Sequence, residues 1–566
     1  MTTGVAAQLP FTGLTGTGTN TTRYLCVAAH INEEFADETI AELADAELRA
    51  VATSTDVDLC PVLRHAVAAR RQHQRRDLTL ALIWILTLVI VPLWAIVCTV
   101  AVAFVAPVAQ RALVSRRIPY LVMGLKWHLA IRAVGAFIGI LALVGFIAII
   151  ISPGYTSNLG LDWLTGAFPF VPLLAPLAWL AMYGVVVHHR FLDRRVVIGA
   201  LGPDHPPLQR MSDADSPRLA ARLAAIDSAQ RGNVTIYSDS PFIGFGSPVR
   251  GWSFALPLLA KRGNGLGSRR DGKKITFFTV DELTKHIKDR LGKISTSRPI
   301  GSLNGHSDRL PGLRVEDRVF VNGRALYEYP LLLPDREHVP VANLGPEELT
   351  LLALNPTGAA RRYLCVHMPS WDGDVTSSTF LHFSTTGSTL YLDCHRTVLG
   401  PPHSWYQDPD RLAHAGPTTR RKLYLFAEGV YVLFSTAWTA PGRFTRHLIT
   451  EIYGDRRRAR IRRLAREDLD FDYGARLSVR ERALDKHYHD YFQPADADKY
   501  LKVVERNVVA ATLDFLDDHG VDTAEFRNSQ LLLLNQGILQ TGGISVVHNQ
   551  AVGAGSNAIQ QAASGL

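Results

Sequence analysis

The sequence predicts an α+β protein in which a multi-span α-helical membrane region precedes a mixed α+β cytosolic domain, a basic helical segment and a tail rich in Gly, Asn and Gln. Three observations support this prediction. Three long apolar stretches lie between residues 78 and 187, short β-rich runs separated by turn residues begin near residue 233, and no charged residue follows Arg527.

The first 22 residues are rich in Thr and Gly and contain no Lys or Arg, so they lack the basic start of a secretory signal. We expect a disordered cytosolic tail over 1–22. Residues 23–77 are predicted to hold a strand at Arg23–Val27, a helix over Asp37–Val51 and a second helix that Pro61 opens.

The predicted transmembrane region spans 78–188 and contains the apolar stretches 78–109, 133–151 and 163–187. About 20 apolar residues cross a bilayer as a helix, so the second and third stretches each suit one crossing. The first stretch suits either a hairpin or one long tilted span, since Pro92 interrupts it. Arginines flank it on both sides, and cytoplasmic loops carry excess Lys and Arg. A multi-pass protein of the bacterial inner membrane with both termini in the cytoplasm is therefore expected.

Ion and proton pathways usually need ionisable groups inside the membrane spans, and the three apolar stretches contain none. Transport is therefore disfavoured. Gly135 and Gly139 form a GxxxG pattern, which permits close helix pairing or simply reflects a stretch of small residues. Pairing of this kind is compatible with a homo-oligomer.

Residues 189–232 are polar and proline-rich, and they are predicted to form a linker with one short helix. A mixed α+β domain is expected over 233–450, with helices at Val280–Leu291 and Pro346–Leu354. Its predicted strands are short runs of β-formers separated by turn residues, namely Val234–Tyr237, Lys274–Val280, Arg318–Val321, Tyr363–His367, Thr379–Phe383, Thr389–Asp393, Lys422–Phe426 and Val430–Phe434.

Residues 451–527 are predicted to be helical, with an amphipathic helix over Tyr500–Asp518 that Gly520 ends. This segment opens with a basic run: Arg456, Arg457, Arg458, Arg460, Arg462, Arg463 and Arg466. Such a run can bind lipid headgroups or an acidic partner, or it can pair with the acidic residues that follow it. No set of stacking aromatic residues accompanies it, which disfavours nucleic acid.

Metal-ligand and acid–base residue types occur without a matching motif. Cys365 and His367 would share one face of a strand, but Cys394 and His395 would point to opposite faces, which suits a tetrahedral zinc site poorly. The run His487-Tyr488-His489-Asp490 also lacks the spacing of a helical metal site. The five cysteines form no CxxC pair, which fits a reducing compartment. We therefore expect no catalytic residue, no metal site and no cofactor.

The tail, residues 528–566, combines uncharged Asn and Gln with apolar β-formers, the composition of segments that stack as cross-β structure. A disordered or locally folded end is the alternative interpretation. If the tail self-assembles, the residues expected to form the stacked strands are Ile538, Gln540, Ile544, Val546 and Val547.

The chain resembles a group of uncharacterised integral membrane proteins of high-GC actinomycetes. The residues that carry this resemblance are RYLCVAAH near the start, the paired apolar stretches, FDYGARLSVRE at Phe471–Glu481, FLDDHGVDT at Phe515–Thr523 and the Gly-rich tail. The resemblance implies architecture and no activity. The piece Gly537–Gly542 also resembles the amyloid-type motifs of immune signalling proteins, although its echo at Ala558–Gln560 lacks the glycine.

From the sequence we expect a non-enzymatic integral membrane protein whose large cytosolic domain binds an unknown protein partner or a signal. Two alternatives remain open. The first is a membrane-tethered enzyme of unrecognised class. The second is a membrane-perturbing effector that self-assembly of the tail controls.

Overall fold

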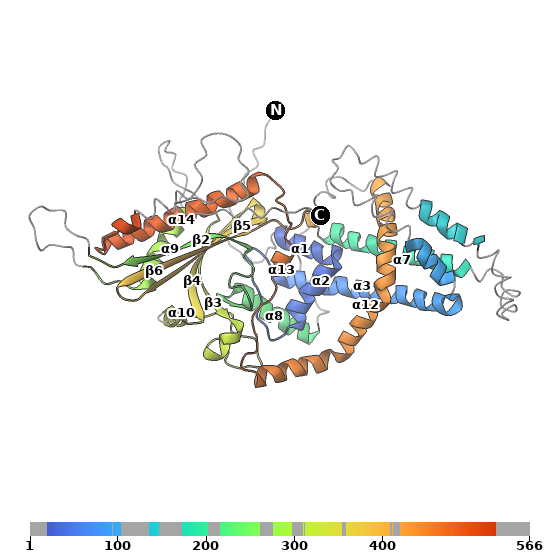
Figure 1. The fold of residues 1–566 in the computed structure, drawn as a ribbon, viewed down its shortest axis with the longest axis horizontal. Helices are drawn as coiled ribbons and strands as arrows, with labels where there is room; N and C mark the ends of the chain where they lie inside the picture. Colours follow the sequence, from blue (N-terminus) through green and yellow to red (C-terminus); the bar gives the residue numbers. More distant parts are fainter. Residues whose placement is uncertain are drawn as a thin grey trace, which may run out of the picture.

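The protein is described here from a computed structural model. The structure describes residues 20–92, 94–103, 135–144, 146–147, 173–201, 216–260, 275–296, 310, 312–353, 358–407, 410 and 419–527. In these ranges a mixed sheet flanked by helices forms one part of the molecule, and a group of long helices forms another (Figure 1).

A six-stranded sheet organises the first part, with strand order β1-β3-β4-β5-β6-β2. Its β1 runs parallel to β3, and every other neighbouring pair is antiparallel. The strands are β1 (Val234–Tyr237), β2 (Ser247–Pro257), β3 (Arg314–Asn322), β4 (Ala360–Ser370), β5 (Val375–Thr385) and β6 (Thr389–Leu399).

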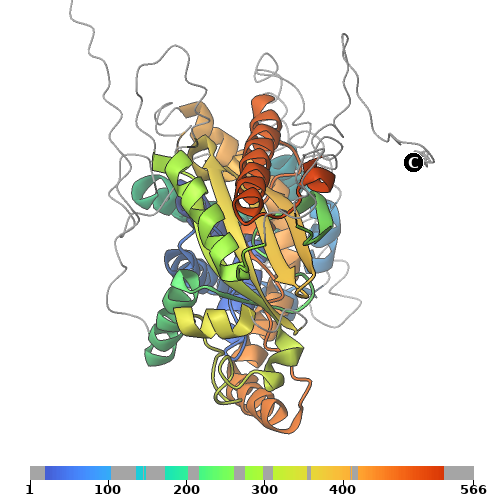
Figure 2. The same ribbon diagram turned by 90° about the vertical axis from the view of Figure 1, so that its left-hand side faces the viewer.

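One face of the sheet packs against α9 (Val280–Thr296) and α14 (Phe492–Asp518), which lie side by side across it (Figure 2). The apolar stripe of α14 that the sequence predicts is buried there, through Leu501, Val504 and Val508. Gly520 follows α14 with a φ of 77°, a left-handed conformation that favours glycine after a helix.

The opposite face carries an aromatic cluster around Phe320, Tyr363 and Phe380, and the loop that holds Phe242 and Phe245 covers it. The remaining short elements near the sheet are η4 (Gly323–Glu328), α10 (Pro346–Ala353), η5 (Trp371–Gly373), η6 (Ser404–Gln407) and α13 (Val479–Arg482).

The N-terminal residues form helices that pack on one another. They are α1 (Asn20–Ile31), α2 (Glu33–Ile40), the π-helical turn η1 (Ala41–Asp45) and α3 (Leu59–Ile90), and α8 (Pro217–Arg231), from later in the chain, packs against them. Asp58 caps α3 by accepting a hydrogen bond from the amide of Cys60, and Ser216 caps α8 in the same manner through Leu219.

The second part joins the outer half of α3 to α7 (Leu174–Ala200), to the first half of α12 (Thr419–Glu467) and to helical residues around 98 and 137. Trp179, Phe137 and Leu433 are buried at its centre. The long helix α12 then leaves this group and bends toward the sheet, with Pro441 inside it (Figure 1).

The predicted multi-span membrane region is wrong, because no helix in the described ranges is both long and apolar enough to cross a bilayer. The predicted multi-pass location in the inner membrane is wrong for the same reason. Residues 78–90, the apolar part of α3, continue a helix that carries Arg75, Arg76 and Asp77, and this helix ends before Pro92. In α7 the apolar run likewise passes without a break into His188, His189 and Arg190.

Several local predictions also differ from the structure. The predicted strand Arg23–Val27 lies in α1, and the predicted strands Lys422–Phe426 and Val430–Phe434 lie in α12. The described part of Lys274–Val280 forms no strand, whereas β2 was not predicted. The strands β1, β3, β4, β5 and β6 and the helices α9, α10 and α14 confirm their predictions.

Candidate functional site at a junction of four helices

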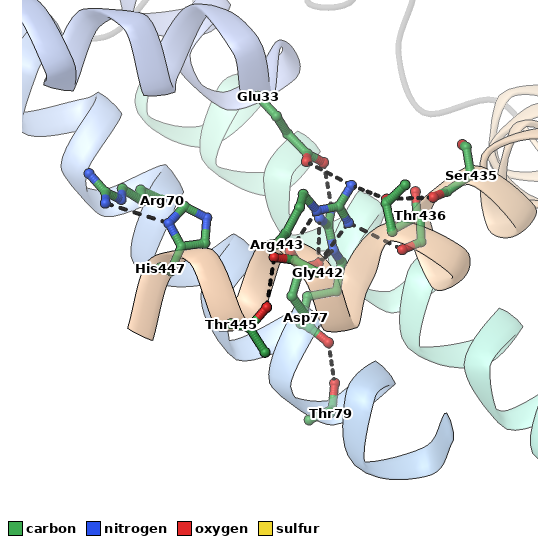
Figure 3. Close-up of polar contacts among 12 residues, drawn as sticks. Glu33, Arg70, Asp77, Thr79, Ser435, Thr436, Gly442, Arg443, Thr445 and His447 are labelled. Atoms are coloured by element: carbon green, nitrogen blue, oxygen red, sulfur yellow. Dashed lines mark hydrogen bonds and ion pairs between the residues drawn. The ribbon is translucent and has the colours of Figure 1, made fainter. Parts of the chain in front are cut away.

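A buried ionic network lies where α2, α3 and α12 meet, and Figure 3 shows Glu33, Asp77 and Arg443 within it. Glu33 stands in the first turn of α2, where Asn32 caps the helix. Asp77 lies in the middle of α3, at the point where the basic half of that helix meets its apolar half. Arg443 follows Pro441 and Gly442 in α12, so it lies next to the one proline inside that helix.

Asp77 is the shared acceptor of the network. Arg443 donates from Nε to its Oδ2 at 2.8 Å and from Nη2 to its Oδ1 at 2.9 Å, a bidentate pair. Arg76 donates to the same Oδ1 from Nε at 3.0 Å and from Nη2 at 2.8 Å. The Asp77 side chain is only 2% exposed, so the network is closed to solvent at its centre.

Glu33 supplies the second carboxylate. Its Oε1 accepts a hydrogen bond from Arg76 Nη1 at 2.7 Å, and its Oε2 lies 3.7 Å from Arg443 Nη1. Burial alone would raise the pKa of Glu33, but the hydrogen bond and charge of Arg76 lower it to about 2. Burial alone would lower the pKa of Arg76, but the carboxylates of Glu33 and Asp77 raise it. Two carboxylates therefore face two guanidinium groups.

Further titratable side chains surround the network. Burial lowers the pKa of His73 and of His189 to about 4, so both imidazoles are neutral at pH 7. Burial raises the pKa of Asp193 in α7 to about 7, and Gln72 Nε2 donates to its Oδ1 at 2.8 Å. A fourth helix, α7, thus contributes a carboxyl group that titrates near neutral pH.

The network holds α12 against α3 and α2. Sequence reasoning did not identify Glu33, Asp77 or Arg443 as site residues. The one available signal was Asp77 itself, an acidic residue that directly follows a run of basic residues and directly precedes an apolar stretch.

A second arrangement on the sheet has the residue types of a hydrolytic triad. Ser378 Oγ lies 2.8 Å from His367 Nδ1, and His367 Nε2 lies 3.5 Å from Glu316 Oε1. However, Ser378 is 0% exposed, and the ring of Phe245 stacks on His367 with an interplanar angle of 8°. A substrate carbonyl has no path to this serine, so the three side chains form a buried polar link between strands.

The candidate zinc ligands are not brought together. Among the described residues no group of three or more metal-ligating side chains forms a site. Cys365 and His367 do share one face of β4, whereas Cys394 belongs to the core on the other face. Near the run His487–Asp490, His489 Nε2 lies 3.3 Å and His403 Nδ1 3.9 Å from Asp485 Oδ2.

The seven arginines of the basic run lie on the second half of α12. Arg458 and Arg462 pair with Glu47 of the neighbouring segment, Arg463 pairs with Glu467, and Arg466 pairs with Glu337. Arg456 stacks over Tyr453 in the same helix, at 5.5 Å from the ring centroid. Arg456, Arg457 and Arg460 are exposed, with no ion pair to another described residue.

The other predicted residues divide between the described and undescribed parts of the chain. Gly135 and Gly139 are exposed, and a Cβ atom built on either would meet no described atom within 4 Å. Ile538, Gln540, Ile544, Val546 and Val547 lie outside the described residues.

Comparison with known protein families matches residues 251–548 to the AbeC-like domain. The match starts within β2, includes β3 to β6, α9, α12 and α14 but not β1, and covers more than half of the chain. The chain belongs to the AbeC-like family. Comparison with curated proteins and comparison with solved structures found no match. The AbeC-like domain therefore contains Arg443, the basic run and the Ser378 arrangement, but Glu33 and Asp77 lie before it.

Proposed function

We propose that this protein is a non-enzymatic binding protein in which the AbeC-like domain receives a partner or a signal and α12 passes the effect to the apolar helices. One observation carries this proposal. The helix α12 packs into two separate cores, through Leu433, Ala437 and Ala440 at one end and through Ile461 and Ala465 at the other.

The ionic network supports this role because it fixes α12 at an intermediate point. A shift of α12 along or around its axis would break the bidentate contact of Arg443 with Asp77 and leave a carboxylate buried without its partner. Such a contact favours two discrete positions of the helix over a continuous slide, which is the behaviour that a transmitting element needs.

The exposed arginines supply a surface for the partner. Arg456, Arg457 and Arg460 extend from α12 where the helix has left the apolar group, and they form no ion pair with another described residue. We assign to them the binding of an anionic partner, either an acidic protein surface or lipid headgroups.

The apolar helices supply a second surface. Four apolar side chains of α3 expose between 57% and 74% of their area, namely Leu82, Ile85, Leu86 and Val89. Exposed apolar surface of this kind marks an interaction site. A Cβ atom on Gly135 or Gly139 would meet no described atom within 4 Å, so the proposal includes a second copy of the chain as the partner that pairs there.

The enzyme alternative would rest on Ser378, His367 and Glu316. A fluorophosphonate probe reacts with an activated serine that is accessible. We expect no labelling of Ser378 in the folded protein, since its side chain is fully buried. Labelling of Ser378 that a Ser378→Ala variant abolishes would establish a hydrolase instead.

We also propose that the chain is related to the uncharacterised actinomycete group, and that its tail acts like the amyloid-type motifs that it resembles. An uncharged tail lacks the repulsion that prevents stacking of exposed strands. Under this extension, assembly of the tail would be one signal that the AbeC-like domain receives.

The transmission role is tested by hydrogen exchange on the full chain. We expect Arg443→Met to speed amide exchange around Leu433–Ala440 and also around Ile461–Glu467, which lies about 30 Å farther along the helix. Arg446→Met is the matched control, because Arg446 is exposed on the same turn of α12. Faster exchange restricted to the turns next to residue 443 would show a local brace and contradict the proposal.

The anionic surface has its own test. The double variant Arg456→Glu/Arg460→Glu should lose salt-sensitive binding to vesicles that contain phosphatidylglycerol, or to an immobilised poly-glutamate if the partner is acidic protein. The double variant Arg324→Glu/Lys499→Glu makes the same charge change at other exposed positions and should retain binding. Equal loss of binding in both double variants would show that binding depends on the net charge of the protein and not on this surface.

A further inference from the structure

The loop between α13 and α14 carries a row of exposed side chains that have no part in the proposed function. It contains the run His487–Asp490, and every residue from 486 to 492 is exposed. Tyr488, Tyr491 and Phe492 expose 42%, 84% and 62% of their area. Large rings that gather on a surface in this way mark a site of interaction.

The backbone of this loop is fixed from within. The carboxylate of Asp485 accepts hydrogen bonds from the amides of Ser404, at 3.2 Å, and His487, at 3.3 Å. Gln493 is 2% exposed, and its Oε1 accepts a hydrogen bond from the amide of His489 at 2.9 Å. The loop therefore presents its side chains from an ordered backbone, and less conformational entropy is lost when a partner binds such a surface.

Two exposed tryptophans lie beside the loop. Trp371 of η5 donates from Nε1 to Asp496 Oδ2 at 3.2 Å, one turn after Phe492 in α14. Trp405 of η6 directly follows Ser404, whose amide binds Asp485. The two tryptophans expose 39% and 43% of their area. The exposed rings around the loop and the start of α14 are called the aromatic surface here: Trp371, Trp405, Tyr488, Tyr491 and Phe492.

A cavity of about 380 Å³ opens next to the aromatic surface. Tyr488 and Pro494 line it, and so does the first half of β2. Its apolar wall consists of Val249, Val398, Leu484 and Leu501. An apolar side chain of a partner would be buried there, and anchors of this kind supply most of the free energy of binding at an interface.

The aromatic surface is acidic although the chain is basic. The segments that carry it, 371–374, 404–407 and 485–502, contain six Asp and three Lys, whereas the whole chain has a net charge of +8. One of these lysines, Lys502, is paired with Asp498 at 2.6 Å. A basic partner is therefore attracted to this surface in particular and not to the protein as a whole.

We infer that the aromatic surface binds a partner protein through an exposed segment that combines Lys or Arg with apolar residues. An apolar side chain of that segment would fill the cavity. Its cationic groups would lie over the rings of Tyr491 and Phe492, where cation–π attraction acts, and next to Asp490. The exposed arginines of α12 are assigned an anionic partner, so the two surfaces select different partners and this inference goes beyond the proposed function.

Fluorescence anisotropy of a labelled synthetic peptide made of Lys and Leu tests this inference on the full-length protein. We expect saturable binding that the double variant Tyr491→Ser/Phe492→Ser weakens by about tenfold or more. The matched control is Phe277→Ser/Tyr327→Ser, which removes rings that are 96% and 48% exposed elsewhere and should retain binding. Peptides with Glu in place of Lys, or with Ser in place of Leu, should not bind. Unchanged far-UV circular dichroism shows that each variant is folded.

Val249→Lys tests the cavity separately. Val249 is 39% exposed, so the position accepts a longer polar side chain, and the added charge should repel a cationic segment and weaken binding. Leu259→Lys is the control, because this 62% exposed position lies beyond the other end of β2 and should bind the peptide as wild type does.

Several outcomes would overturn the inference. They are the absence of saturable binding by the Lys/Leu peptide, equal weakening in both double variants, equal binding of the Glu peptide, and binding that Val249→Lys leaves unchanged. A dimer in analytical ultracentrifugation that Tyr491→Ser/Phe492→Ser dissociates would place a second copy of the chain on the surface instead. None of these measurements depends on α12 or on its arginines, so this inference and the proposed function fail independently.

Discussion

Arg443 in α12 donates two hydrogen bonds to the carboxylate of Asp77 in α3, across 366 positions of the sequence. The contact joins the AbeC-like domain to helices that precede it. Arg76 uses the same carboxylate, so one buried aspartate balances two guanidinium groups.

Asp77→Asn should lower the free energy of unfolding by about 3–5 kcal/mol, because it leaves two largely desolvated arginines without their shared charge. Urea denaturation followed by circular dichroism measures the change. Asp455→Asn is the control, since that side chain is 74% exposed in an ion pair with Arg458, and a much smaller change is expected. Equal losses in the two variants would show that Asp77 contributes no more than a surface charge.

Asp193 should make stability depend on pH. Burial raises its pKa to about 7, so the folded protein holds a proton that the unfolded chain has lost above about pH 4. The resulting stability is complete below pH 4 and disappears as the pH rises through 7. Asp193→Asn should remove this part of the dependence and make the protein more stable than wild type at pH 8. The exposed Asp518→Asn should follow the wild-type curve, and a wild-type slope in Asp193→Asn would reject the assignment.

Gly246 should not tolerate a side chain. Its φ of 90° is left-handed, and a Cβ atom would lie 2.3 Å from the carbonyl oxygen of Val398. Gly246→Ala should therefore destabilise the protein by roughly 1–3 kcal/mol in thermal or chemical unfolding. Gly292→Ala, inside α9 where a Cβ atom would meet no described atom within 4 Å, should stabilise by about 0.5–1 kcal/mol. If both variants changed the free energy of unfolding in the same direction, the described conformation of Gly246 would be wrong.

The cysteines should react in a set order. Cys26, Cys98, Cys365 and Cys394 are buried, whereas Cys60 is partly exposed and burial raises its pKa to about 12. Iodoacetamide should label the folded protein slowly at Cys60 and at the other four only after unfolding, as read by mass spectrometry. Cys365→Ala and Cys394→Ala should leave any cellular phenotype intact at normal abundance. Rapid labelling of Cys365 would instead indicate a reactive thiol.

Local pattern predicted the sheet strands where apolar and β-branched residues alternate, and it predicted α9, α10 and α14 from their amphipathic spacing. The pentapeptide RYLCV shows its limit. At Arg362–Val366 it forms part of β4, and at Arg23–Val27 it forms part of α1. In α1 four of its five residues are buried against neighbouring helices, so tertiary packing determines the structure of this sequence.

Two further features were not predicted from the sequence, each for a specific reason. The strand β2 contains Pro248, Gly251 and Pro257, residues that normally end strands, and a bulge lies between Val249 and Trp252. The contact between Asp77 and Arg443 has no local signal at all, because its two halves lie on helices far apart in the chain. The sequence reveals the apolar stretches directly, but it does not show that each of them continues a helix that also contains charged residues.

The two anchors of α12 also fix its length. Arg443 contacts α3 while Ala465 enters the core near Tyr473, and each residue of an α-helix adds about 1.5 Å and about 100° of rotation. One inserted residue between them would turn Ala465 away from its core. Seven would restore the facing direction to within about 20° but carry Arg462 and Arg466 about 10 Å past Glu47 and Glu337. The number of residues in α12 between Arg443 and Ala465 is therefore constrained by both rotation and distance.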